Sequence, residues 1–160
     1  MNKASLHQQV ISQLETLQAT ARGAAQTAYE AATDEANIAE NKYDTLGLEA
    51  SYLATGQARR AEELRHTLGI WKQLVLRPFD PDVGIQLGAL ICLADSQDRQ
   101  QWLFLGPEGA AMKLHHEGHS VQVIGPQSPL GRALQGKGCG DEVEVQVGQA
   151  RQYYQVLRVD

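Results

Sequence analysis

The sequence predicts an α+β fold, in which an antiparallel hairpin of two long helices precedes a small β domain that contains one short helix. Residues 2–75 contain no proline and are rich in Ala, Gln, Glu and Leu, a composition that favours long helices. Apolar residues in this range recur at spacings of three and four, as they do along one face of a helix. From Arg77 onward, prolines and short apolar runs separated by turn residues predict strands instead.

Two apolar seams in the first half predict the hairpin. The residues of the first seam are Leu6, Val10, Leu14, Leu17, Ala21, Ala24, Ala28 and Ala31, and those of the second are Leu64, Leu68, Trp71 and Val75. Two seams in one short chain bury each other most easily when the chain folds back as an antiparallel coiled coil, here with a tip near residues 34–40. Each arm of about 30 residues would be about 45 Å long. We expect four large residues to pair at the base of the hairpin: Leu6, Leu14, Leu68 and Trp71.

The same seams fit an alternative, a coiled coil between two chains that serves dimerisation. The protein would then be a dimerising adaptor. An elongated monomer in solution is expected of the hairpin, and an elongated dimer of the alternative. We expect a monomer.

The second half reads as a twisted or barrel-like β-sheet with one helix against it. Turn residues separate five runs that are typical of strands, at 87–93, 101–106, 120–124, 142–147 and 153–159. The segment from Ser128 to Leu134 is predicted to be a short helix, because Ser128 is a good N-cap, Pro129 suits the first helical position and Gly136 can end it. The predicted domains are therefore the helical hairpin at 2–75 and the β domain at 80–160.

Overall charge and hydrophobicity narrow the class of protein. The formal net charge of −5 over 160 residues argues against a general nucleic-acid coat and against sequence-specific DNA binding, because such proteins carry surplus Lys and Arg. A partner with a basic or metal-bearing surface fits better. No run of about 20 apolar residues occurs, and the N-terminal residues lack the apolar core of a signal peptide. We therefore expect a soluble, cytoplasmic protein with no membrane association.

Cysteines and histidines give weak signals for metal binding. Cys92 and Cys139 are far apart, match no ligand spacing and are expected to be two buried thiols in a reducing compartment. His115, His116 and His119 could bind zinc as neutral imidazoles. They lie beside Gly118 in an apparent turn between strands, where adjacent side chains point in opposite directions. We expect an exposed turn there and no metal site.

An acidic cluster surrounds the predicted hairpin tip. Its members, against the single Lys42, are Glu30, Asp34, Glu35, Glu40, Asp44 and Glu49. Carboxylates are ligands for hard cations such as Mg²⁺, and a two-helix arm would present them to a partner. The competing interpretation is a solvated tip whose charges lie near the positive end of the second helix. The second helix also carries four basic residues, Arg59, Arg60, Arg65 and Lys72. They could form a contact surface for a partner, or they could simply keep the helix soluble.

The stretch from Gly125 to Val145, which begins Gly-Pro-Gln-Ser-Pro-Leu-Gly-Arg, resembles the C-terminal domain of the Gre transcript-cleavage factors, which are bacterial transcription elongation factors. Members of that family carry a Ser-Pro helix, then Gly-Lys, an acidic valine-rich strand and a final strand like the one at 153–159. This resemblance covers about residues 85–160. The segment Ala39–Tyr43 is similar to the Lys-Glu-Asn segment that opens the second hairpin helix in Gre proteins, with Glu40 and Asn41 matching directly. The order of modules also matches, so we expect a divergent Gre-type paralogue.

The resemblance implies that the arm enters the secondary channel of bacterial RNA polymerase. Tip carboxylates, here Asp34, Glu35 and Glu40, would help hold a magnesium ion of the polymerase active site, with Asn37 and Asn41 as polar tip residues. The polymerase would then cut backtracked RNA, so the factor would be no enzyme and would have no catalytic residues or cofactor of its own. The arm could also contact nascent RNA.

One departure leaves the tip's role open. Gre cleavage factors place an Asp three residues before the Glu of the Lys-Glu-Asn segment, where this chain has the neutral Asn37. Asp34 or Glu35 could substitute. The protein is therefore expected either to stimulate cleavage or to occupy the channel and modulate polymerase without cleavage.

The resemblance also implies an FKBP-like β domain that docks on polymerase. The predicted docking residues are Ser128, Pro129, Leu130 and Arg132. Isomerase activity is not expected, because nothing in the sequence supplies an aromatic-lined pocket of the kind such enzymes need.

Overall fold

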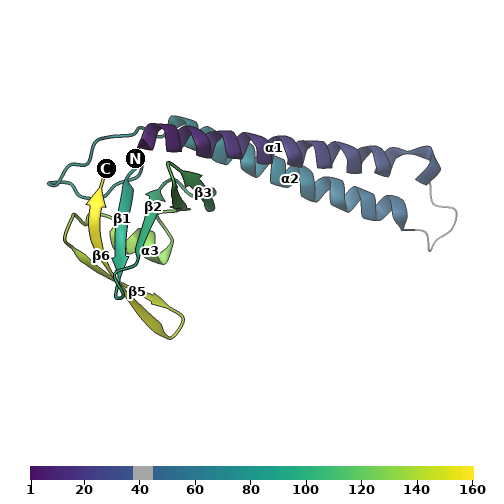
Figure 1. Cartoon of the computed structure of the whole chain (residues 1–160). Coiled ribbons are helices and arrows are strands. Elements are labelled where there is room, and N and C mark those ends of the chain that lie inside the picture. Colours follow the sequence, from purple (N-terminus) through teal and green to yellow (C-terminus); the bar gives the residue numbers. More distant parts are fainter. Residues whose placement is uncertain (38–44) are drawn as a thin grey trace. The chain divides into compact units, whose positions relative to one another are not determined.

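The computed structural model describes residues 1–37 and 45–160 and confirms the α+β fold (Figure 1). Two long helices, α1 (Lys3–Thr33) and α2 (Leu46–Gln73), are followed by a six-stranded sheet and one short helix, α3 (Pro129–Leu134). A turn of 3₁₀ helix, η1 (Glu35–Asn37), follows α1. The strands are β1 (Leu90–Asp95), β2 (Gln100–Leu105), β3 (Met112–His116), β4 (His119–Ile124), β5 (Glu142–Val147) and β6 (Ala150–Val159).

The chain forms two compact units. One comprises Ile11–Gly69 and is called the arm unit; the other comprises Met1–Val10 together with Ile70–Asp160 and is called the sheet unit. The first turns of α1 and the last turn of α2 thus belong to the sheet unit. The domain bounds 2–75 and 80–160 were inferred from sequence patterns and not from contacts in space, and they stay a prediction.

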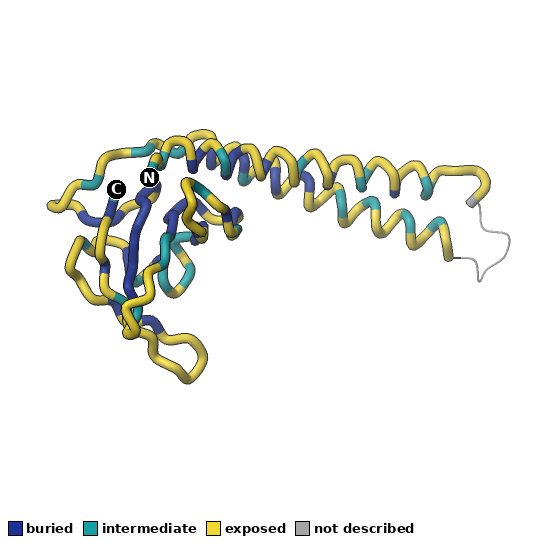
Figure 2. Tube along the Cα trace, viewed as in Figure 1, coloured by how far each residue is buried: buried dark blue, intermediate teal, exposed yellow. Residues whose placement is uncertain are grey.

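The arm unit is the predicted pair of antiparallel helices (Figure 1). Toward the distal end of this unit, the buried residues of α1 are alanines: Ala21 is 6% exposed and Ala28 is 5% exposed. Figure 2 shows that most of the distal part is exposed. Leu17 was predicted to lie in the seam but is 40% exposed, while Gln18 is half-buried instead. The turn between Leu14 and Ala21 offers two positions for the seam, and apolarity alone does not decide which one faces the other helix.

Among the described residues, no helix is long and apolar enough to span a bilayer.

The ends of the helices explain a second difference. Asn2 caps α1, since its Oδ1 accepts the backbone N–H of Ser5 at 3.0 Å. Val75 was predicted to continue the second seam, yet it is 61% exposed because α2 ends at Gln73. The four residues predicted at the base, Leu6, Leu14, Leu68 and Trp71, are all buried.

The sheet of the sheet unit has the strand order β3-β4-β2-β1-β6-β5. All neighbours are antiparallel except β2 and β4, which run parallel. One face packs with α3 through Leu134 and a cluster that includes Leu103 and Val156. On the outer face, the ring of Trp71 lies 5.9 Å from that of Phe104. The sheet therefore separates two apolar layers within this unit.

Strand β3 was missed by the sequence analysis. Its residues, Met112–His116, contain one buried side chain, Leu114, and no β-branched residue, so they carry no strong strand pattern. The strand forms because its backbone pairs with β4, from Met112 opposite Val123 to His116 opposite His119. The predicted strand at 87–93 begins only at Leu90, because Gly88 has a φ of 90° and lies in a turn.

The prediction of two buried thiols is half wrong. Cys92 is 3% exposed within β1, and burial raises the pKa of its thiol. Cys139 is exposed, because it lies between Gly138 and Gly140 in the turn that precedes β5. Within the described ranges, 1–37 and 45–160, no three His, Cys, Asp or Glu side chains could hold a metal ion together.

Candidate functional site

At the distal end of the arm unit, Asp34 directly follows α1. Its Oδ1 accepts the backbone N–H of Ala36 at 2.9 Å, which closes the turn that starts η1. Asp34 and Glu35 are both exposed. The structure therefore places both predicted tip residues, exposed to solvent, directly after the end of the first helix. Glu40 and Asn41 lie outside the described residues, and Asn37 is placed only as the last residue of η1.

Two other acids near the tip have local partners. Gln26 Nε2 donates to Glu30 Oε1 at 2.8 Å, one helical turn apart. Thr45 Oγ1 donates to Glu49 Oε1 at 3.1 Å, in the first turn of α2. A carboxylate in a first helical turn stabilises the helix through its dipole. Glu49 is thus explained by helix formation, and Glu30 has a partner within α1. Asp34, although its Oδ1 accepts the Ala36 N–H, stays a candidate ligand together with Glu35.

Two basic residues of α2, Arg60 and Arg65, pair with acids on the same helix. Arg65 donates two short hydrogen bonds from its guanidinium to Glu62, at 2.6 and 2.9 Å, and this hydrogen bonding lowers the pKa of the Glu62 carboxyl. Arg60 lies 3.9 Å from Glu63. All four side chains are more than half exposed, so these pairs contribute little to stability. Ordinary helix solubility accounts for Arg60 and Arg65.

In the sheet unit, helix α3 presents the predicted docking residues in two different ways. Ser128 is the N-cap: its hydroxyl donates to the Gly125 carbonyl at 2.7 Å and accepts the Gly131 N–H at 3.1 Å. Leu130 packs partly against the core. Pro129 and Arg132 are exposed, and Arg132 Nε donates to Gln127 Oε1 at 3.2 Å. The surface that a partner can touch is therefore formed by Pro129 and Arg132, while Ser128 and Leu130 hold the helix in place.

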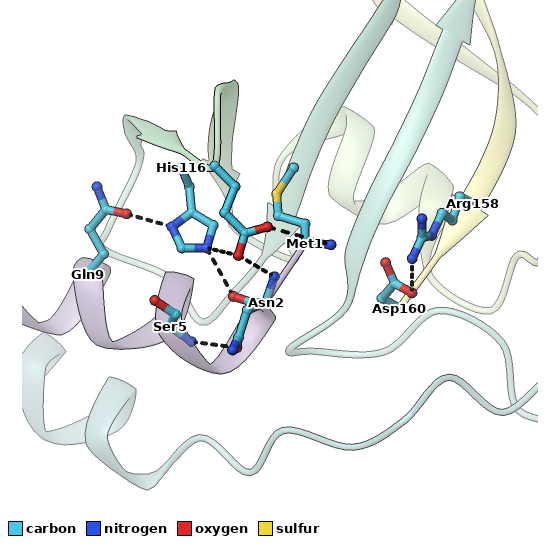
Figure 3. A network of polar contacts seen from close by, with 8 residues as sticks. Met1, Asn2, Ser5, Gln9, His116, Arg158 and Asp160 are labelled. Carbon is cyan, nitrogen blue, oxygen red and sulfur yellow. Dashed lines mark hydrogen bonds and ion pairs between the residues drawn. The ribbon is translucent and has the colours of Figure 1, made fainter.

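Of the three histidines, His116 belongs to a polar network that the sequence analysis missed (Figure 3), while the exposed His119 ring lies 5.6 Å from that of Trp102. His116 Nε2 donates to the Asn2 carbonyl at 3.1 Å, and its Nδ1 lies 3.2 Å from Gln9 Oε1. The Gln9 side-chain amide in turn donates to the His115 carbonyl at 3.0 Å. Glu117 Oε1 accepts the backbone N–H of Asn2 at 3.1 Å. These contacts tie the first turns of α1 to the β3–β4 turn, so the residues there have a structural role.

No signal in the sequence could have shown this network, because its partners are more than 100 residues apart. The predicted turn itself is present. Glu117 and Gly118 both have positive φ, of 48° and 80°, as in the two-residue turns that join antiparallel strands.

Comparisons with known proteins agree with the C-terminal resemblance. The family model described as "Transcription elongation factor, GreA/GreB, C-term" matches residues 81–160. No curated protein matches the chain. Among solved structures, Thermus aquaticus Gfh1 is 20% identical over 95% of this chain and 92% of its own, with a TM-score of 0.41. A structure of the transcription factor Gfh1 is 23% identical over 96% and 92%, with a TM-score of 0.42. The GreA/GreB elongation factor from Nitrosomonas europaea is 20% identical over 62% and 78%, with a TM-score of 0.38.

The matched segment begins at Pro81 and includes every strand of the sheet and α3. It contains the Ser-Pro helix, the Gly-Lys turn, the acidic valine-rich β5 and the final β6, in that order. The match extends over 80 of the 160 residues, which is half of the chain. This chain belongs to the GreA/GreB family of transcription elongation factors.

Proposed function

We propose that this protein binds bacterial RNA polymerase, with its sheet unit docked through α3 and its arm in the secondary channel, and thereby modulates transcription elongation. The observation that carries the proposal is the family match over residues 81–160. The exposed Pro129 and Arg132 on α3 support it, because they offer a partner an apolar ring beside a guanidinium. The protein is expected to act as a monomer in the cytoplasm, with polymerase as the catalyst.

The arm would act through its tip carboxylates. Asp34 and Glu35 are exposed neighbours, and Mg²⁺ accepts one or two protein carboxylates together with waters and substrate oxygens. Such an ion, shared with the polymerase, would activate a water that cuts backtracked RNA. Glu40 is the third proposed carboxylate. Because the neutral Asn37 replaces the Asp of the family pattern, occupation of the channel without cleavage is the other version of the same proposal.

The most direct test of the tip uses backtracked elongation complexes with end-labelled RNA and magnesium. If the tip stimulates cleavage, the wild type shortens the RNA, and the double variant Asp34→Ala/Glu35→Ala or the variant Glu40→Ala slows shortening by tenfold or more, as loss of a metal ligand would. Glu63→Ala, which removes an exposed carboxylate elsewhere on α2, should leave the rate within twofold of wild type.

A wild type that shortens no RNA but displaces a bona fide cleavage factor from the complex would instead support the non-cleaving version. If neither effect occurs, the polymerase proposal is wrong.

A dimerising adaptor is the second candidate, because the distal half of the arm exposes large apolar side chains. Leu48, Tyr52 and Leu53 of α2 are 53%, 69% and 57% exposed, and Tyr29 of α1 is 59% exposed. Exposed apolar groups of this size are typical of surfaces that another protein covers. Sedimentation velocity decides between the candidates: we expect a monomer at micromolar concentration, and a dimer that Leu53→Ser/Tyr52→Ser dissociates would favour the adaptor.

A further inference from the structure

A groove of about 750 Å³ lies on the sheet unit and is lined in part by the segment that joins α2 to β1. The course of this joining segment can be followed in Figure 1. Its walls carry four large aliphatic side chains that are exposed to solvent. Their exposed fractions are 41% for Ile70, 61% for Val75, 49% for Val83 and 41% for Leu87. The core residue Ile85, which is 1% exposed, also lines the groove. The groove is therefore an apolar surface feature above the core.

Single exposed aliphatic residues are common on protein surfaces, but a group around one hollow is typical of a binding site. Covering four such side chains would be favourable, because each removes apolar area from water. Apolar side chains that gather around one hollow are a liability for aggregation when nothing covers them. The groove is therefore a candidate binding site for an apolar partner.

Backbone hydrogen bonds hold the walls of this groove in place. The N–H of Ile85 donates to the Lys137 carbonyl at 2.8 Å, and that of Gly136 donates to the Ile85 carbonyl at 2.9 Å. Lys3 Nζ donates to the Arg77 carbonyl at 2.5 Å, so the first turn of α1 also fixes the joining segment. A site with fixed walls loses little conformational entropy when it is filled. The groove is therefore preorganised for binding.

The charge of the groove restricts the occupant. Arg77 alone carries a charge among the described residues that line the groove. Apolar walls with one guanidinium complement an apolar segment that bears a carboxylate, which arginine can bind with two parallel hydrogen bonds. A nucleic acid, which needs several cations along its backbone, does not fit such a surface.

The position of the groove connects it with α3. Gln135 and Gly136, which directly follow α3, line the groove. A helix of six residues rises only about 9 Å, so the exposed Pro129 and Arg132 lie within reach of a partner surface that fills the groove. One partner can thus cover both features.

We propose that this groove is a second docking surface for RNA polymerase, filled by an apolar polymerase segment whose carboxylate pairs with Arg77. The inference rests on the proposed function and adds to it a site outside the Ser-Pro helix. It makes the joining segment between α2 and β1 part of the interface, although that segment has no regular secondary structure.

The test compares the affinity of full-length variants for purified RNA polymerase. Val75→Ser/Val83→Ser removes apolar area from two exposed positions, and Arg77→Glu reverses the charge. We expect each to raise the Kd tenfold or more. Val147→Ser is the matched control, because Val147 is 54% exposed on β5 and does not line the groove, and it should change the Kd less than twofold. Thermal unfolding of each variant should occur near the wild-type Tm, since all the changed side chains are exposed.

The possible outcomes distinguish failure of the groove proposal from failure of the proposed function. If the wild type binds polymerase and the folded groove variants bind equally well, the groove is not a docking surface, while the proposed function stands. If the wild type does not bind polymerase at all, both proposals are wrong. If the wild type dimerises and Val75→Ser/Val83→Ser abolishes the dimer, the occupant is a second copy of the chain and the inference is overturned.

Discussion

Replacing Trp71 by Ala should lower the free energy of unfolding by about 3–5 kcal/mol, the range found when a large buried aromatic side chain is removed. Trp71 is 0% exposed, and its ring lies 5.9 Å from that of Phe104 and 6.1 Å from that of His7. Its backbone carbonyl accepts a hydrogen bond from His7 Nε2 at 2.8 Å. The indole thus joins the last turn of α2, the first turns of α1 and the outer face of the sheet within one unit. Its removal would leave a cavity where these three elements meet.

The position of Gly106 strengthens this expectation. A Cβ atom on Gly106 would lie 2.1 Å from the indole ring, so the ring rests directly on the backbone of the residue after β2. Gly106 itself has no side chain that could fill that space once the indole is gone. Collapse of the cavity would have to move the backbone, which makes the upper part of the range the expected result.

Urea denaturation followed by circular dichroism measures the effect, with two control variants. Trp71→Phe keeps an aromatic ring and removes the buried indole N–H, which has no hydrogen-bond partner among the described residues, so it should cost clearly less than Trp71→Ala. Trp102→Ala removes the same side chain from a half-buried position on β2 and should also cost less. A loss for Trp71→Ala no greater than that for Trp102→Ala would show that Trp71 is not the anchor of this unit.

The helical hairpin and the α3 region could be predicted because their signals are local. The spacing of apolar residues determines a helix face, and Ser128 followed by Pro129 is a helix start whatever surrounds it. The family resemblance drew on the same local stretch, and the match over residues 81–160 confirms it. These features needed no knowledge of which distant segments pair.

Features that depend on distant pairing could not be predicted. Strand β3 exists because β4 offers it a partner, and the His116 network exists because Asn2 and Gln9 lie next to the β3–β4 turn. The groove likewise combines α2, the joining segment and the end of α3. For the tip, sequence reasoning named the acids, and the structure adds the local bonds of three of them: Glu30 with Gln26, Glu49 with Thr45, and Asp34 with the backbone of Ala36.

Gly84 is the position where a single methyl group is expected to damage both the fold and the groove. Its φ is +82°, a conformation that costs most residues about 1–3 kcal/mol. A Cβ there would also lie 2.4 Å from the carbonyl oxygen of Gly136, which is backbone and cannot rotate away. The joining segment would have to move off the chain that follows α3, and the hydrogen bonds between Ile85 and residues 136–137 would lengthen or break. We therefore expect Gly84→Ala to destabilise the protein by more than its backbone strain alone.

Gly140→Ala separates the two contributions. Gly140 has a similar φ of +89°, but a Cβ there meets nothing within 4 Å, so this variant reports the backbone strain without the steric clash. The difference between the two free energies of unfolding, measured in urea, isolates the close approach of Gly84 to Gly136. Equal losses would mean that the approach costs nothing. A second measurement compares polymerase binding by the two variants at a temperature where both are folded. If Gly84→Ala loses more stability and also binds more weakly than Gly140→Ala, the contact between Gly84 and Gly136 sets the shape of the groove. The comparison is informative because, of the two glycines, only Gly84 lies against a residue that lines the groove.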